Sequence, residues 1–142
     1  MLNLLALPLH APIVHFPVAM LTITWVCVIV RHVSGSTAWD ERTRLFELVG
    51  VLALPVTIVT AFVDTRGFDF LTDPRLDAPL IWHMAAGLAA TVFFGWHFMW
   101  RRHRASVDLR GHLAMVDVGL ATLGMLALTA AGLLAAEMVY AT

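Results

Sequence analysis

The chain has little of what a soluble protein carries on its surface. Charged residues make up 13% of the sequence, whereas typical soluble domains have about 25%. Lysine is absent, so all nine basic residues are arginine. Hydrophobic residues account for 60% of the chain, and its mean hydropathy is +0.82. This composition excludes a soluble globular domain and predicts several membrane-spanning segments.

A strong net charge and reactive cysteines are also missing. The net charge is −1, so there is no basic field to attract nucleic acid, and we expect no nucleic-acid partner. The single cysteine, Cys27, has no CxxC partner and lies inside an apolar run, where it reads as a packing residue. The chain also lacks HExxH, GxSxG, a glycine-rich phosphate loop and the CxxCH motif of covalent haem. These absences leave enzymatic activity undecided and favour an electron-transfer or binding protein over a stand-alone enzyme.

Four apolar segments follow one another along the chain. They cover about residues 12–33, 45–63, 80–100 and 113–140, and each approaches or exceeds the ~20 residues that a helix needs to cross ~30 Å of hydrocarbon. Short connections make neighbouring helices antiparallel. We therefore predict an all-α membrane protein, with residues 1–142 forming a single up-down bundle of four transmembrane helices.

The arginines predict the orientation of this bundle. The second connection has only Arg66 and Arg75, accompanied by four aspartates. The remaining seven arginines lie in the first and third connections, which the positive-inside rule assigns to the cytoplasm. These residues are Arg31, Arg42, Arg44, Arg101, Arg102, Arg104 and Arg110. We expect a multi-pass protein of the bacterial inner membrane with both termini outside, in the periplasm.

Polar residues of all four segments share one depth near the predicted outer surface. His15 lies one turn into the first segment and His83 one turn into the third, which runs in the same direction, so both are expected roughly 5 Å below the boundary. Asp64 ends the second segment at this surface, and Glu137 lies near the end of the fourth. His10 lies on the outer rim. The topology therefore predicts a layer of histidines and carboxylates.

This layer favours a b-type haem. We expect His15 and His83 to be its axial ligands, because neutral imidazoles from facing bundle helices commonly hold haem iron. Below His83, the small residues Gly87 and Ala90 share its helical face and leave room for a flat macrocycle. Ligand binding and an apolar environment would then come from the protein, and redox chemistry from the cofactor.

Two other interpretations of the same layer stay open. In the first, His10, His15 and His83 hold a copper, zinc or iron ion directly, together with Asp64 or Glu137. In the second, histidines and carboxylates form a network that only joins the helix ends. In the haem interpretation, Asp64 or Glu137 would instead interact with the ring nitrogen of a histidine ligand that does not bind the iron, and so orient the ring.

A second haem is a further hypothesis. His97 follows His83 by fourteen residues on the same helical face, a spacing suited to two stacked haems. The first segment has Ile29 where a matching histidine is wanted, which leaves His32 and His112 as candidate partners. The alternative is that His97 makes a hydrogen bond across the bundle.

Two further carboxylates lie near the predicted cytoplasmic surface. Asp117 is expected to pair with a nearby arginine or with His112, and Glu47 lies near the start of the second segment. Both suit a structural role, and a proton path is the alternative.

The opening motif resembles that of a known family. His10-Ala-Pro-Ile-Val-His15-Phe-Pro17 is similar to the HPxxVHFP opening of a bacterial four-helix integral membrane domain of unknown function. The similarity continues through Gly50, Val63-Asp64 and His83. It ends at Glu137-Met-Val-Tyr140, where the family has GGELVY. This chain differs in placing proline two residues after His10 and in replacing the paired glycines by alanines.

The resemblance covers essentially the whole chain and implies a four-helix membrane domain. Relatives are joined to Rieske iron–sulfur or cytochrome c domains, which implies a redox setting. We therefore expect electron transfer between a periplasmic partner, such as a cytochrome c or Rieske-type subunit, and the quinone pool or another membrane subunit. A homo-oligomer or a subunit of a larger complex is expected. The alternatives are a non-haem metal-binding module and a structural accessory subunit of a respiratory-type complex.

Overall fold

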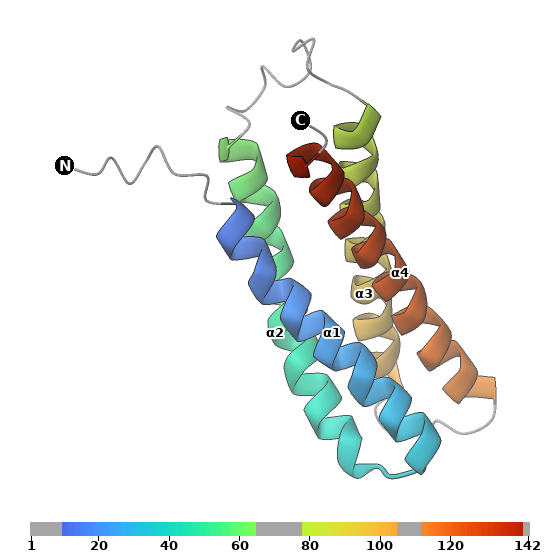
Figure 1. Cartoon of the computed structure of the whole chain (residues 1–142). Helices are drawn as coiled ribbons and strands as arrows, with labels where there is room; N and C mark the ends of the chain where they lie inside the picture. Colours follow the sequence, from blue (N-terminus) through green and yellow to red (C-terminus); the bar gives the residue numbers. More distant parts are fainter. Residues whose placement is uncertain (1–9, 65–77, 105–111, 141–142) are drawn as a thin grey trace.

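The computed structural model describes residues 10–64, 78–104 and 112–140, and within these ranges every regular element is an α-helix. The helices are α1 (His10–Ser34), α2 (Ala38–Asp64), α3 (Ala78–His103) and α4 (His112–Tyr140), which run up and down in turn (Figure 1). The predicted all-α bundle of four membrane-length helices is therefore confirmed. Which end faces the cytoplasm stays a prediction.

The first connection is a short turn that joins α1 and α2 as an antiparallel hairpin. Gly35 adopts a positive φ of 66°, and its N–H donates to the carbonyl oxygen of Arg31 at 2.8 Å. This is the glycine-dependent cap that ends many helices. Helix α2 then begins at Ala38, earlier than the apolar run that starts at about residue 45. Asp40 and Glu41 occupy its first turn, where carboxylates interact favourably with the helix dipole.

The bundle buries little of its helices and exposes many large apolar side chains on its outside. All four helices are long and apolar enough to span a membrane, yet only 11–28% of each candidate span is buried within the protein. Large side chains such as Trp82, Leu88 and Leu133 are more than 60% exposed. Contiguous apolar surface of this extent has no stable place in water and fits contact with lipid.

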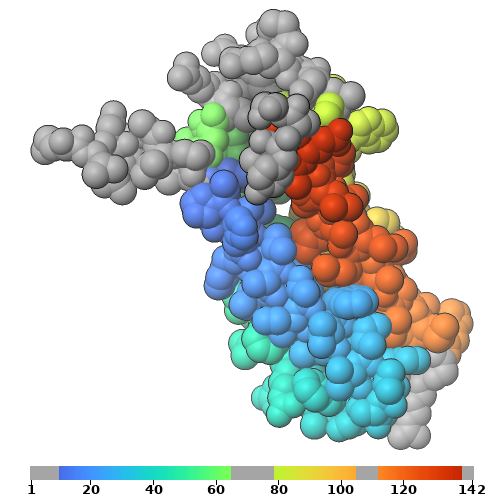
Figure 2. Space-filling model, in the orientation of Figure 1, coloured from blue at the N-terminus to red at the C-terminus, as the bar shows by residue number. Residues whose placement is uncertain are grey.

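The helices pack as two hairpins, α1 with α2 and α3 with α4 (Figure 1). On the face shown in Figure 2, α1 and α4 run side by side along the bundle. Polar contacts join the hairpins there. Trp25 Nε1–H donates to Thr122 Oγ1 at 3.1 Å, and the Thr22 hydroxyl lies 3.8 Å from the sulfur of Met125. Such interhelical hydrogen bonds are a recognised source of membrane helix association.

The apolar centre of the bundle is small. Leu21, Leu54 and Phe94 form its buried cluster, with Val51 and Leu128 packed against them. One polar layer lies at each end of this cluster. We call the end at which α1 and α3 begin the upper end, and the opposite end the lower end, as drawn in Figure 1.

Candidate functional site

At the upper end, a histidine from α1 lies against a histidine from α3. The rings of His10 and His83 have centroids 6.5 Å apart and planes at 87° to each other. His10 is the first residue of α1, and its backbone N–H donates to Asp64 Oδ2 at 2.7 Å. A carboxylate at the end of α2 thus caps the start of α1, where a negative charge is favourable.

Both rings are held by backbone carbonyls of neighbouring helices. His10 Nδ1 lies 3.0 Å from the Thr57 oxygen in α2, and His83 Nδ1 lies 2.8 Å from the Ala131 oxygen in α4. Because a carbonyl only accepts hydrogen bonds, each Nδ1 carries the proton and each Nε2 keeps a free lone pair. Among the described residues, neither Nε2 has a hydrogen-bond partner. In the neutral tautomer that this arrangement selects, the pair presents two Nε2 lone pairs.

His15 occupies a different position from the one that its spacing predicts. Its side chain is exposed, and its Nδ1 lies 2.6 Å from the carbonyl oxygen of Ala11 in the same helix. The ring contact to His83 comes from His10 instead. Glu137 is also exposed. Asp64 contacts the backbone of His10, so the groups that orient the ring nitrogens are carbonyls and not the carboxylates we expected.

The two small residues that the sequence places below His83 differ in their surroundings. An added Cβ at Gly87 would meet no atom within 4 Å. Ala90 is buried, with 1% of its surface exposed. Within the described ranges, no three His, Cys, Asp or Glu side chains are grouped so as to hold a metal ion.

The lower end contains a second polar layer, which is more deeply buried. His97 of α3 is fully inaccessible and lies between two carboxylates. Its Nδ1 contacts Glu47 Oε1 of α2, and its Nε2 lies 3.2 Å from Asp117 Oδ1 of α4. Glu47 and Asp117 are likewise buried. Both ring nitrogens thus lie close to carboxylate oxygens, and of these two contacts the one to Glu47 has hydrogen-bond geometry.

Two arginines extend this layer to all four helices. Arg101 Nη1 donates to Asp117 Oδ2 at 2.8 Å, and its Nη2 donates to Asp40 Oδ1 at 2.7 Å. Arg31 of α1 reaches the same oxygen of Asp40, with its Nε at 2.5 Å. Asp117 therefore pairs with an arginine, one of the two partners that the sequence predicts.

The proposed partners of His97 for a second haem lie elsewhere. His32 and His112 are both exposed, while both ring nitrogens of His97 are engaged by carboxylates. The interhelical hydrogen bond that we considered as the alternative is present. The convergence of Glu47, His97 and Asp117 was not predicted, although the same comparison of depths that we applied to the upper layer would have revealed it.

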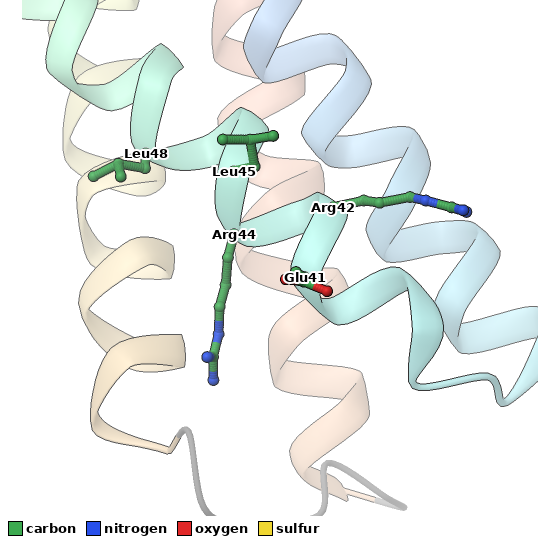
Figure 3. Close-up of a pocket in the computed structure, with 5 residues that line it drawn as sticks. All are labelled: Glu41, Arg42, Arg44, Leu45 and Leu48. Atoms are coloured by element: carbon green, nitrogen blue, oxygen red, sulfur yellow. The ribbon is translucent and has the colours of Figure 1, made fainter.

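A shallow pocket near the lower end is lined by residues of α2 alone (Figure 3). Its lining residues are Glu41, Arg42, Arg44, Leu45 and Leu48. The Arg42 guanidinium lies over the Trp39 ring, 4.7 Å from its centroid. Arginine, tryptophan and exposed leucine on one helix face are typical of a membrane–water boundary. The pocket is a feature of that surface and not an enclosed cofactor site.

Comparison with known proteins identifies the family of the chain. The family model described as "Predicted membrane protein (DUF2231)" matches residues 6–142. No curated protein and no solved structure matches the chain significantly.

Proposed function

Since the chain belongs to this family of membrane proteins, whose description names no activity, we propose from the geometry that it is a b-type haem protein that transfers electrons within the membrane. The observation that carries the proposal is the pair of anchored imidazoles at the upper end. His10 and His83 are its proposed axial ligands, with His10 in the place that we first gave to His15.

The distance between the two rings supports this ligand pair. A metal–imidazole bond is about 2.0 Å long, so two rings on opposite sides of one metal have centres roughly 6 Å apart. The measured separation of the His10 and His83 centroids is 6.5 Å. Histidine ligands also normally donate their other ring N–H to a carbonyl or carboxylate, as both rings do here. His10 and His83 are therefore the residues that would hold the haem iron.

The same donors favour a haem over a bare metal ion. Copper or zinc would need three or four protein ligands, and the described residues contain no group of three. A haem brings four nitrogens of its own and needs only the axial pair.

The roles of the chain follow from its contacts. The carbonyls of Thr57 and Ala131 fix the tautomer and orientation of the two rings, and the apolar helices exclude water. Bound haem would supply the one-electron chemistry. The arginine distribution predicts that the upper end faces the periplasm. We therefore propose that the protein exchanges electrons there with a periplasmic cytochrome c or Rieske-type protein. Its second redox partner would be the quinone pool or a membrane subunit.

Absorption spectra of ligand variants test this proposal. We expect His10→Ala and His83→Ala to lose haem or to change to a spectrum with one imidazole ligand, because each removes one axial nitrogen. Added imidazole should restore the original spectrum of a variant that is folded. His15→Ala is the matched control, since it removes an exposed histidine from the same helix. Full haem with an unchanged spectrum in His10→Ala would show that His10 is not a ligand.

A further inference from the structure

The lower layer holds a histidine whose surroundings require an additional proton. A neutral imidazole has one N–H donor and one acceptor nitrogen. Here Nδ1 faces Glu47 and Nε2 faces Asp117. If both carboxyl groups were ionised and His97 were neutral, one ring lone pair would face a carboxylate oxygen without a proton between them. Such a contact is repulsive, and in a buried site it is not screened by water.

The count of charges leads to the same requirement. Three carboxylates, Asp40, Glu47 and Asp117, face two arginines, Arg31 and Arg101, in one layer. With a neutral His97 the layer has a net charge of −1, since three negative charges meet two positive ones. One more proton makes it neutral. An unbalanced charge buried in a membrane protein is costly, so the neutral form is favoured.

We propose that Glu47, His97 and Asp117 form a buried proton-binding site, which holds one proton beyond that of a neutral imidazole. The proton lies on the imidazole or on Glu47, and it moves between them along the contact of Oε1 with Nδ1. In that step the Oε1–H bond breaks and the Nδ1–H bond forms, so the total charge of the triad is unchanged. This site does not depend on the haem at the upper end.

The surroundings indicate how the proton is retained and where it exchanges. Asp117 is held on its other oxygen by Arg101, whose guanidinium does not give up a proton in proteins. The arginine therefore closes that side of the triad. Three atoms of the triad are buried without a hydrogen-bond partner among the described residues: Glu47 Oε2, His97 Nε2 and Asp117 Oδ1. Buried atoms of this kind are satisfied by a proton or by water. Because Glu47 lies at the end of the triad away from Arg101, we place the exchange point there.

Solid-state NMR of the full chain in lipid bilayers tests the proposal without a mutation. With ¹⁵N-labelled histidine and ¹³C-labelled aspartate and glutamate, His97 is identified as the ring in contact with one glutamate and one aspartate carboxyl carbon. At neutral pH we expect either two protonated ring nitrogens or one protonated carboxyl group in contact with the ring. One unprotonated ring nitrogen between two ionised carboxylates would overturn the proposal.

A pair of glutamine variants distinguishes a proton site from a purely structural network. In Glu47→Gln the remaining charges of the layer already balance with a neutral His97, and the amide N–H can donate to Nδ1. We therefore expect the variant to fold with a single protonated ring nitrogen on His97, whichever group holds the additional proton in the wild type. Glu41→Gln changes an exposed carboxylate of the same helix and should leave the His97 signals unshifted. A doubly protonated His97 ring in a folded Glu47→Gln variant would contradict the assignment.

Discussion

Arg101 is the side chain on which the lower layer depends most. It connects Asp117 in α4 to Asp40 in α2 while itself belonging to α3, and only 4% of its side chain is exposed. Asp40 in turn contacts Arg31 of α1. Burying these ions carries a desolvation cost that their mutual pairing offsets. The layer therefore specifies how the four helices meet, and it tolerates the loss of one partner poorly.

Replacing this arginine should destabilise the bundle strongly. In Arg101→Met, Asp117 loses its pairing on Oδ2 and Asp40 keeps only Arg31. Breaking a buried pair in this way costs about 3–5 kcal/mol. The free energy of unfolding in detergent or bilayers measures the effect. Arg102→Met, which changes the exposed neighbouring residue, should alter that free energy by no more than about 0.5 kcal/mol. Equal effects of the two substitutions would remove the special role given to Arg101.

Individual residues also show where reasoning from sequence reached its limit. His10 and His15 are five positions apart, so they point in directions that differ by roughly 140° around a helix of 3.6 residues per turn. Only one of them can face His83. The spacing from Pro12 favours His15, but α1 begins at His10 because Asp64 of a different helix caps its first N–H. A contact between residues 54 positions apart leaves no trace in the local pattern.

At the scale of the helices, two glycines set how closely neighbours approach. An added Cβ at Gly50 would lie 2.7 Å from Leu21, and one at Gly124 would lie 2.9 Å from the ring of Phe94. Both neighbours belong to the buried apolar cluster. Small residues at such positions allow membrane helices to pack by close van der Waals contact. Gly50 lies at the contact between α1 and α2, and Gly124 at the contact between α3 and α4.

A substitution at Gly124 tests the importance of this close approach. Because the Phe94 ring is rigid and fully buried, Gly124→Ala should lower the free energy of unfolding by about 1–3 kcal/mol, the usual cost of overpacking. Gly119→Ala lies on the same helix, where an added Cβ meets nothing within 4 Å, and should be neutral or stabilising. Combining Gly124→Ala with Phe94→Leu should recover part of the loss. A Gly124→Ala variant as stable as Gly119→Ala would mean that the helices can separate without cost.

The helices themselves were predictable because the bilayer imposes a simple length requirement. The four apolar runs lie within the four helices, and the largest difference occurs at the start of α2. That helix extends through Asp40, Glu41 and Arg44, which an apolar pattern does not include. Asp40 and Glu41 interact favourably with the helix dipole in the first turn, and Asp40 also contributes to the lower layer.

At the scale of the whole molecule, charge is distributed unequally between the two ends. The arginines of the described residues all lie toward the lower end. They are Arg31, Arg42, Arg44, Arg101, Arg102 and Arg104. Two of them also serve the buried layer, so orientation and helix packing use the same residues. The positive-inside rule therefore predicts that the lower end faces the cytoplasm.

Single cysteines can measure this orientation. In a Cys27→Ala background, Ser36→Cys lies in the exposed connection at the lower end and Glu137→Cys on the exposed surface of α4 near the upper end. A membrane-impermeant maleimide added to spheroplasts should label the cysteine at position 137 and leave that at position 36 unlabelled. Permeabilised cells should allow labelling of both, which controls for reactivity. The reverse pattern would invert the predicted topology and the location of the redox partner.

The distance between the two layers also belongs to this scale. His83 and His97 are separated by fourteen residues of α3, which corresponds to roughly 21 Å along the helix axis. From the sequence we predicted the all-α architecture and placed both histidines on one helical face. We considered both of them as candidate haem ligands. Their functions differ because of their neighbours, which are backbone carbonyls for His83 and carboxylates for His97. Which side chains meet across helices depends on packing that a single sequence does not specify.

The haem content of the purified wild-type protein tests the central proposal most directly. We predict one haem b per chain, measured as the pyridine haemochrome relative to protein, with the absorption spectrum of a low-spin iron that has two imidazole ligands. A single haem is expected because His10 and His83 lie against each other from two helices, whereas His97 lies between two carboxylates and His32 and His112 are exposed. A colourless protein, isolated from cells supplied with haem precursors and shown to be folded, would contradict the proposal.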